Sequence, residues 1–237
     1  MRGDLYSFSA LTELYRSTEV RELKPDTPYL ILSDLHLGDG SMRDDFLQNS
    51  RLTLTALRDY YLPRGYTLIL NGDVEELQRY PMHAIRSQWT EAYELFAQFQ
   101  SLGRFHRVFG NHDLALATPH EYGIDALEAL RYRWKDDDIF IFHGHQTSQR
   151  FTKHNDLVGL LLRVFANPLA IKNYSVSHDS RRRFKTERRV YEFSSRRKVL
   201  SIIGHTHRPL FESMSKVDSI KFQVERLCRD YPSAKPA

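Results

Sequence analysis

The chain carries the stretch Leu30-Ile31-Leu32-Ser33-Asp34-Leu35-His36-Leu37-Gly38, in which an apolar run ends in a carboxylate and an imidazole two positions apart. The apolar run is typical of a buried strand, where residues two apart face the same side. In an open α/β sheet, ligands bind at the carboxyl ends of the strands, so both side chains are expected in one cleft. The pair by itself fits equally well with a turn carboxylate and a surface histidine.

Later segments of the chain repeat this arrangement. Predicted strands alternate with predicted helices, which indicates an α/β layered domain. The strands that end in metal-competent residues are predicted at 30–32, 66–70, 105–109, 139–142 and 199–203. The metal-competent residues that follow them, here called the seven candidate ligands, are Asp34, His36, Asp73, Asn111, His143, His205 and His207. A further strand is predicted at 131–134, and helices are predicted at 5–16, 46–61 and 122–130 and around a break at Pro81.

The seven candidate ligands have the chemistry that a pair of divalent cations needs. Carboxylate and amide oxygens are hard ligands, neutral imidazoles supply nitrogen, and one carboxylate can bridge two ions. Glycines at 38, 72, 110, 144 and 204 allow tight turns next to a crowded centre. The alternative requires separate accidents at every strand end, so the pattern favours a metal site.

The overall composition sets the class of protein. A chain of 237 residues with 41% hydrophobic and 27% charged residues is typical of a soluble globular protein. We expect one domain over residues 1–237, with a helical cap or insert at about 146–198. The single cysteine, Cys228, excludes an intramolecular disulfide, and neither a signal peptide nor a membrane span is recognisable. We therefore expect a cytoplasmic protein.

The motifs D-x-H, G-D, G-N-H-D, H and G-H-x-H occur in this order from Asp34 to His207 and resemble those of the calcineurin-like metallophosphoesterase superfamily. The resemblance implies a four-layer αββα sandwich with a two-metal site at the strand ends. It assigns one metal to Asp34, His36, Asp73 and His207, and the other to Asp73, Asn111, His143 and His205. Asp73 would bridge the two ions. We expect manganese, with iron or zinc as alternatives.

The implied activity is that of a hydrolase, a phosphatase or related enzyme that cleaves a phosphate ester or pyrophosphate bond with a metal-activated hydroxide. His112 would act as the acid or electrostatic stabiliser, oriented by Asp113. The alternative for His112 is a structural histidine behind the ligands. His145 is interpreted as incidental.

The predicted insert is strongly basic. Between Gln146 and Lys198 there are 13 lysines and arginines against four acidic residues, and an apolar stretch at 157–170 precedes the cluster Arg181, Arg182 and Arg183. One interpretation is a solvated helical cap. The other is a lid that gathers a polyanionic, amphipathic substrate, which would also allow peripheral association with a membrane.

Within the superfamily, the nearest resemblance is to the UDP-2,3-diacylglucosamine hydrolase branch. It shares S-D-L-H-L, G-D-x-x-E at Gly72–Glu76, and G-H-T-H-R-P at Gly204–Pro209, although that branch has arginine where His112 stands. The last G-H-x-H is followed by a helix-like stretch at 214–228 instead of the further strands of the superfamily.

The alternative functions are this type of lipid pyrophosphatase, a serine/threonine-type protein phosphatase and a nuclease. Nucleic acid is not favoured because the insert lacks evident aromatic stacking platforms. A metal-free scaffold is disfavoured because no ligand is missing.

Overall fold

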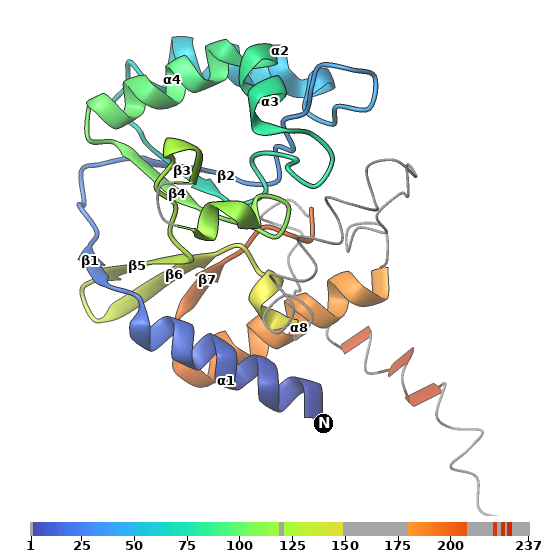
Figure 1. Cartoon of the computed structure of the whole chain (residues 1–237). Coiled ribbons are helices and arrows are strands. Elements are labelled where there is room, and N and C mark those ends of the chain that lie inside the picture. The colour runs from blue at the N-terminus through green and yellow to red at the C-terminus, as the bar shows by residue number, and fades with distance from the viewer. Residues whose placement is uncertain are drawn as a thin grey trace, which may run out of the picture.

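Two β-sheets face each other in the computed structural model, and helices lie on the outer side of each (Figure 1). The structure describes residues 2–118, 121–148 and 180–207, together with residues 220, 221, 224, 225, 227 and 228. The predicted α/β fold with two sheets and flanking helices is confirmed. None of the described helices combines the length and apolar character that crossing a bilayer requires.

The first sheet is parallel and has the order β2-β3-β4, with β2 at Tyr29–Leu32, β3 at Thr67–Asn71 and β4 at Phe105–Val108. Every residue of β3 is buried, which explains its continuous apolar sequence. Leu32 pairs with Leu70, and Asn71 pairs with Val108, so the three strands end nearly level. The polar residues that follow them therefore meet at one edge of the sheet.

Three helices cover the outer face of this sheet. They are α2 (Leu47–Ala56), which continues as the π-helical turn η1 (Leu57–Tyr61), α3 (Met82–Gln88) and α4 (Thr90–Ser101). Leu57, Ile85 and Phe99 from these helices are almost fully buried in one cluster with Leu68 of β3. The cluster fixes the outer face of the sheet, so its strand ends have a rigid support.

The second sheet has the order β1-β5-β6-β7 and comprises β1 (Val20–Glu22), β5 (Ala129–Trp134), β6 (Asp137–Phe142) and β7 (Leu200–Ile202). The strands β5 and β6 are antiparallel, whereas β7 runs parallel to β6. Ile69, Val108, Leu130 and Ile141 form the buried layer between the two sheets.

The helix predicted at 122–130 is wrong. Only the short 3₁₀ turn η3 (Glu121–Gly123) is helical there, and Ala129 already belongs to β5. The backbone of Leu127 donates to Arg107 O at 2.9 Å and accepts from Phe109 N at 3.0 Å. Pairing of this segment with the edge of β4 therefore overrides its helix-like spacing of apolar residues.

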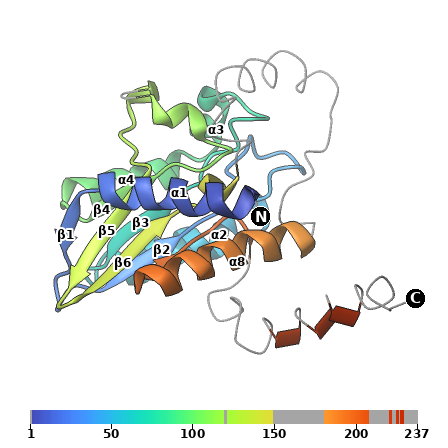
Figure 2. The ribbon, with the colours of Figure 1, turned by 90° about the horizontal axis from the view of Figure 1, so that it is seen from below.

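The helices α1 (Arg2–Ser17) and α8 (Ser180–Arg197) cover the outer face of the second sheet. Figure 2 shows them in front of the strands when the molecule is viewed from below. Leu11 of α1 and Phe193 of α8 are fully buried against Phe140 and Phe142 of β6. Of the cap predicted at 146–198, the described part consists mainly of α8. The apolar stretch at 157–170 lies outside the described residues, as does most of the stretch at 214–228.

Candidate metal centre

The seven candidate ligands all lie just beyond strand ends, at the same edge of the two sheets. Asp34 and His36 follow β2, Asp73 follows β3, Asn111 follows β4, His143 follows β6, and His205 and His207 follow β7. Asp34, His36, Asp73, His205 and His207 hold the left-handed backbone conformation, with φ between 50° and 67°. This region is uncommon outside glycine and clusters at functional sites. The local backbone is therefore bent to aim these side chains inward.

Asp34, His36 and His207 form the first cluster. Their ligand atoms all lie within 4.8 Å of one another. His207 Nε2 is 3.3 Å from Asp34 Oδ1 and 3.3 Å from His36 Nε2. A carboxylate oxygen and two ring nitrogens thus converge on one small volume.

Asp73, His143 and His205 form the second cluster, again with ligand atoms within 4.8 Å of one another. All three are at least 94% buried. His143 Nδ1 donates to Asn71 O at 2.9 Å, which points His143 Nε2 toward Asp73 Oδ2, 3.0 Å away. This backbone contact fixes both the tautomer and the orientation of the ring, as is usual for a ligating histidine.

Asp34 and Asp73 join the two clusters. His143 Nε2 lies 3.0 Å from Asp73 Oδ2 and 4.0 Å from Asp34 Oδ1. His205 N donates to Asp34 Oδ1 at 3.0 Å, which ties the loop after β7 to the loop after β2. The two clusters therefore form a single centre.

Two glycines allow this close approach. A Cβ on Gly110 would lie 2.1 Å from Asp73 Oδ1, and a Cβ on Gly204 would lie 2.6 Å from Asp34 Oδ2. Both distances are shorter than any tolerated contact, and both involve candidate ligands. Any larger residue at either position would displace a carboxylate from the centre.

The surroundings keep both carboxylates ionised. Burial alone would raise the pKa of Asp34, but the hydrogen bond from His207 and the neighbouring His143 hold it below its usual range. Burial also opposes ionisation of Asp73, yet His143 and His112 hold the pKa of Asp73 well below its usual range. Burial lowers the pKa of His205 to about 3, and His143 adds to the effect, so the His205 imidazole is neutral.

The residues present fit a pair of metal ions. The donor set consists of ionised carboxylates and imidazoles, which suits divalent cations. Asn111 is 8% exposed, and its Oδ1 has no hydrogen-bond partner among the described residues. A buried amide oxygen without a partner is costly unless something binds it.

Glu76 is a buried carboxylate that the site prediction did not include. Its side chain contacts His112 Nδ1 at 2.8 Å and His36 Nδ1 at 3.1 Å. Burial opposes ionisation, but these two hydrogen bonds lower the pKa of Glu76 to about 2. The G-D-x-x-E motif contains Glu76 and was the available signal. Glu76 thus holds one candidate ligand and the candidate acid together.

His112 lies beside the centre. Its backbone N donates to Asp73 Oδ1 at 2.7 Å, and its Nε2 is 4.0 Å from Asp73 Oδ2. Burial lowers the pKa of His112, but Asp73 and Glu76 outweigh it and raise that pKa above its usual value. His112 therefore tends to carry a proton.

Asp113 makes its described hydrogen bonds to the backbone. Its carboxylate accepts from Gly110 N at 2.5 Å, from Val74 N at 2.8 Å and from Asp73 N at 3.3 Å. The described contact that orients the His112 ring comes from Glu76, so Asp113 holds the two loops around Asp73 instead. Buried Arg107 lies 3.8 Å from Asp113 Oδ2.

The predicted substrate residues Arg181, Arg182 and Arg183 belong to the first turn of α8. The side chains of Arg181 and Arg182 lie outside the described part. The position of the helix is fixed further along, where Arg189 Nη1 donates to Thr147 O at 2.9 Å in the 3₁₀ turn η4 (His145–Thr147). His145 is buried in this turn, with its ring 5.6 Å from that of His143.

Comparison with known proteins adds evidence from the sequence. The sequence model of the calcineurin-like phosphoesterase family matches residues 27–227. No curated protein gives a significant match. Among solved structures, a conserved uncharacterized protein of Streptococcus pneumoniae TIGR4, described as a predicted phosphoesterase, is 18% identical. That match covers 57% of this chain and 55% of the other, with a TM-score of 0.25, so the chain spans about half the length of that protein.

Proposed function

We propose that this chain, which belongs to the calcineurin-like phosphoesterase family, is a metal-dependent phosphoester hydrolase that acts at the centre described above. The observation that carries this proposal is a pair of adjacent clusters, one around Asp34 and one around Asp73, within each of which the ligand atoms lie within 4.8 Å of one another. Separate hydrogen-bonded histidines would not need to converge in this way.

The family uses two metal ions, and the clusters suggest how this chain would hold them. One ion would be held by Asp34, His36 and His207, the other by Asn111, His143 and His205, with Asp73 between them. Two bound divalent cations would supply Lewis acidity for the phosphoryl oxygens and a hydroxide nucleophile at neutral pH. We expect manganese, with iron or zinc as alternatives.

The chain itself would contribute the proton for the leaving group. His112 has a raised pKa, and its Nε2 faces the centre at 4.0 Å from Asp73 Oδ2. Glu76 would hold the His112 ring through Nδ1, which leaves Nε2–H free to donate to the departing oxygen. Asp113 would keep the loops after β3 and β4 together, so that Asp73 stays in place.

For the substrate, we propose a polyanionic phosphate ester or pyrophosphate. A short connection joins the carboxyl end of α8 to the start of β7, which runs parallel to β6. The amino end of α8 therefore lies at the opposite edge of the sheet, where β6 and β7 end. Arg181 to Arg183 are six to eight residues ahead of Arg189, and they reach roughly 9–12 Å past its contact with the η4 turn. Their charge would gather an anionic substrate. Our more specific hypothesis is that the chain belongs to the UDP-2,3-diacylglucosamine hydrolase branch. We further propose that it forms one domain with a cap at 146–198 and that it acts in the cytoplasm.

The test combines metal analysis of the purified protein with hydrolysis of a panel of substrates. The panel contains a phosphomonoester, a phosphodiester, a nucleotide-sugar pyrophosphate, a phosphoserine peptide and single-stranded DNA. We expect about two metal ions per chain and the highest kcat/KM on the pyrophosphate. A metal-free protein that hydrolyses none of them after addition of manganese, iron or zinc would refute the proposal.

A further inference from the structure

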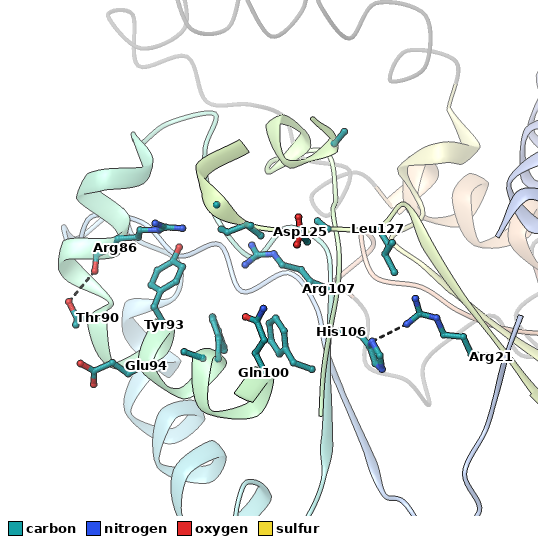
Figure 3. Close-up of a pocket in the computed structure, with 17 residues that line it drawn as sticks. Arg21, Arg86, Thr90, Tyr93, Glu94, Gln100, His106, Arg107, Asp125 and Leu127 are labelled. Atoms are coloured by element: carbon teal, nitrogen blue, oxygen red, sulfur yellow. Dashed lines mark hydrogen bonds between the residues drawn. The ribbon is translucent and has the colours of Figure 1, made fainter. Parts of the chain in front are cut away.

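A cavity of about 860 Å³ lies between α4 and the segment at 123–127 (Figure 3). Phe105, His106 and Arg107 from the start of β4 line it, whereas the candidate metal centre lies beyond the end of β4. None of the seven candidate ligands lines the cavity. Its volume falls within the range of roughly 300–1,000 Å³ that is usual for small-molecule sites.

The walls of this cavity suit a flat apolar body. Tyr93 and Phe96 from α4 line it together with Phe105, and the rings of Phe96 and Phe105 are stacked with centroids 5.9 Å apart. Ile124 and Leu127 line the opposite side. Aromatic side chains in the wall of a cavity pack well against the flat ring of a ligand.

Arginines lie at both ends of the cavity, as Figure 3 shows. Arg86 is exposed and forms no ion pair with a carboxylate among the described residues, and its Nη2 donates to Tyr122 O at 2.7 Å. At the other end, Arg21 Nη1 donates to His106 Nδ1 at 3.1 Å, and burial together with Arg21 lowers the pKa of His106, so this ring is neutral.

Glu94 and Asp125 also line the cavity, and neither forms an ion pair with Arg86 within the described part of the chain. In Figure 3 Glu94 points away from the cavity, whereas the exposed Asp125 lies between Arg86 and Leu127. The arrangement therefore favours a negatively charged group near Arg86.

The inner wall of the cavity is preorganised. Arg107 is 4% exposed and forms an ion pair with Glu75, and Tyr93 Oη donates to the same Glu75 carboxylate at 2.7 Å. A fixed wall binds a ligand without a large ordering cost.

We propose that this cavity is a binding site for a small organic anion with a flat, aromatic or apolar body. The ring system lies between α4 and the segment at 123–127, and its carboxylate, sulfonate or phosphate group faces Arg86. The site needs no metal ion, so it stands or falls independently of the hydrolytic activity.

The probe for this site is 8-anilinonaphthalene-1-sulfonate, titrated into the purified full-length protein by calorimetry. Ala97 is exposed on α4 and lines the cavity, so Ala97→Trp fills it, whereas Gln98→Trp places the same ring on the neighbouring exposed position outside the lining. We expect one saturable site that Ala97→Trp weakens roughly tenfold or more and Gln98→Trp leaves unchanged. Far-ultraviolet circular dichroism and a melting temperature close to those of the wild type should show that both variants are folded.

A second comparison tests the charge. N-phenyl-1-naphthylamine has the same ring system without the sulfonate and should bind more weakly. Arg86→Gln should weaken the sulfonate probe roughly 2–5-fold, the range expected for one exposed charge contact, and leave the neutral probe unchanged. Absence of saturable binding, or equal binding by both tryptophan variants, would overturn the site. Equal affinity of the two probes would overturn its preference for anions.

Discussion

At the scale of single residues, the centre depends on strained backbone. Asp34, Asp73 and His207 are examples of candidate ligands with φ between 52° and 56°, a conformation that costs of order 1–3 kcal/mol in a non-glycine residue. The surrounding hydrogen bonds impose it, such as His36 N to Asp73 O at 3.0 Å. Strain of this kind persists where it aims side chains at a ligand.

Asp73 is the residue on which the whole centre depends, since its carboxylate contacts His143 after β6 and the backbone of His112 after β4. Asp73→Ala should lower bound metal and reduce hydrolysis by more than the roughly 10–100-fold that loss of a ligand's hydrogen-bond partner costs. Circular dichroism should show a folded chain. Metal content by mass spectrometry and initial rates provide the measurement, and wild-type activity in this variant would contradict the two-metal assignment.

His112 should behave as an acid instead of a ligand. His112→Ala is expected to retain bound metal and to lower kcat roughly 10²–10⁴-fold, most for poor leaving groups. Because the pKa of His112 is raised, the wild-type rate should fall as the pH rises through that value, and this limb should disappear in the variant. A parallel loss of metal would show instead that His112 supports the ligands.

Glu76 should affect both metal binding and proton donation, because it contacts the candidate ligand His36 and the candidate acid His112. Glu76→Gln keeps the shape but removes the charge, and we expect a loss of roughly 10–100-fold in activity or metal affinity. The pH limb assigned to His112 should shift to lower pH, since the negative charge no longer stabilises its protonated form. If the rate of the variant fell at the same pH as that of the wild type, the role of Glu76 would be purely structural.

At the scale of elements, Asp138 connects the second sheet to α1. Its carboxylate accepts from Arg131 Nε at 2.9 Å, from Arg133 and from the Tyr15 hydroxyl. Burial acts to raise the pKa of Asp138, but Arg133, Tyr15 and Arg131 together hold it below its usual range. The beginning of β6, the strand β5 and the last turn of α1 thus share one charged group.

Asp138→Asn should therefore lower the free energy of unfolding at pH 7 by roughly 1–3 kcal/mol, while Asp137→Asn on the exposed neighbour should change it little. A depressed pKa in the folded state means that this stabilisation is fully present above the unfolded pKa of about 3.9 and is lost progressively as the pH falls from there toward the lower folded pKa. Urea denaturation at pH 7, 4 and 3 should show the difference between wild type and variant narrowing below pH 4. A constant difference would exclude the charge as its source.

Predictability from sequence also differed between elements. The ends of β2, β3 and β6 could be predicted because strongly apolar runs precede their candidate ligands, whereas β4 contains His106 and Arg107 and is a weaker strand pattern. The strand β1 could not, since Val20 is its one apolar residue and its conformation comes from pairing with Arg131 of β5. Contacts between side chains across loops, such as Glu76 with His112, depend on backbone conformations that no spacing in the sequence specifies.

At the scale of the whole molecule, both sheets contribute to one centre, and α8 extends from the second sheet toward it. Its carboxyl half is anchored by Val190 and Phe193, which are buried against β6 and α1. Its amino end carries Arg181 to Arg183 past the contact between Arg189 and Thr147. An anchored helix that carries this basic first turn would let the protein select large anionic substrates without altering the chemistry.

The corresponding prediction concerns the triple change of Arg181, Arg182 and Arg183 to Gln. KM for a polyanionic substrate should rise several-fold, and added salt should abolish the difference, since exposed charges are screened beyond about 8–10 Å at ordinary ionic strength. Turnover of a small activated phosphoester, which contacts the centre alone, should not change. The control removes the same charge at the far end of the second sheet by changing Arg16, Lys135 and Arg196 to Gln, and it should leave KM unaltered. Equal losses on large and small substrates would indicate a folding defect, whereas equal KM values for both triple variants would show that the arginines do not contribute to substrate binding.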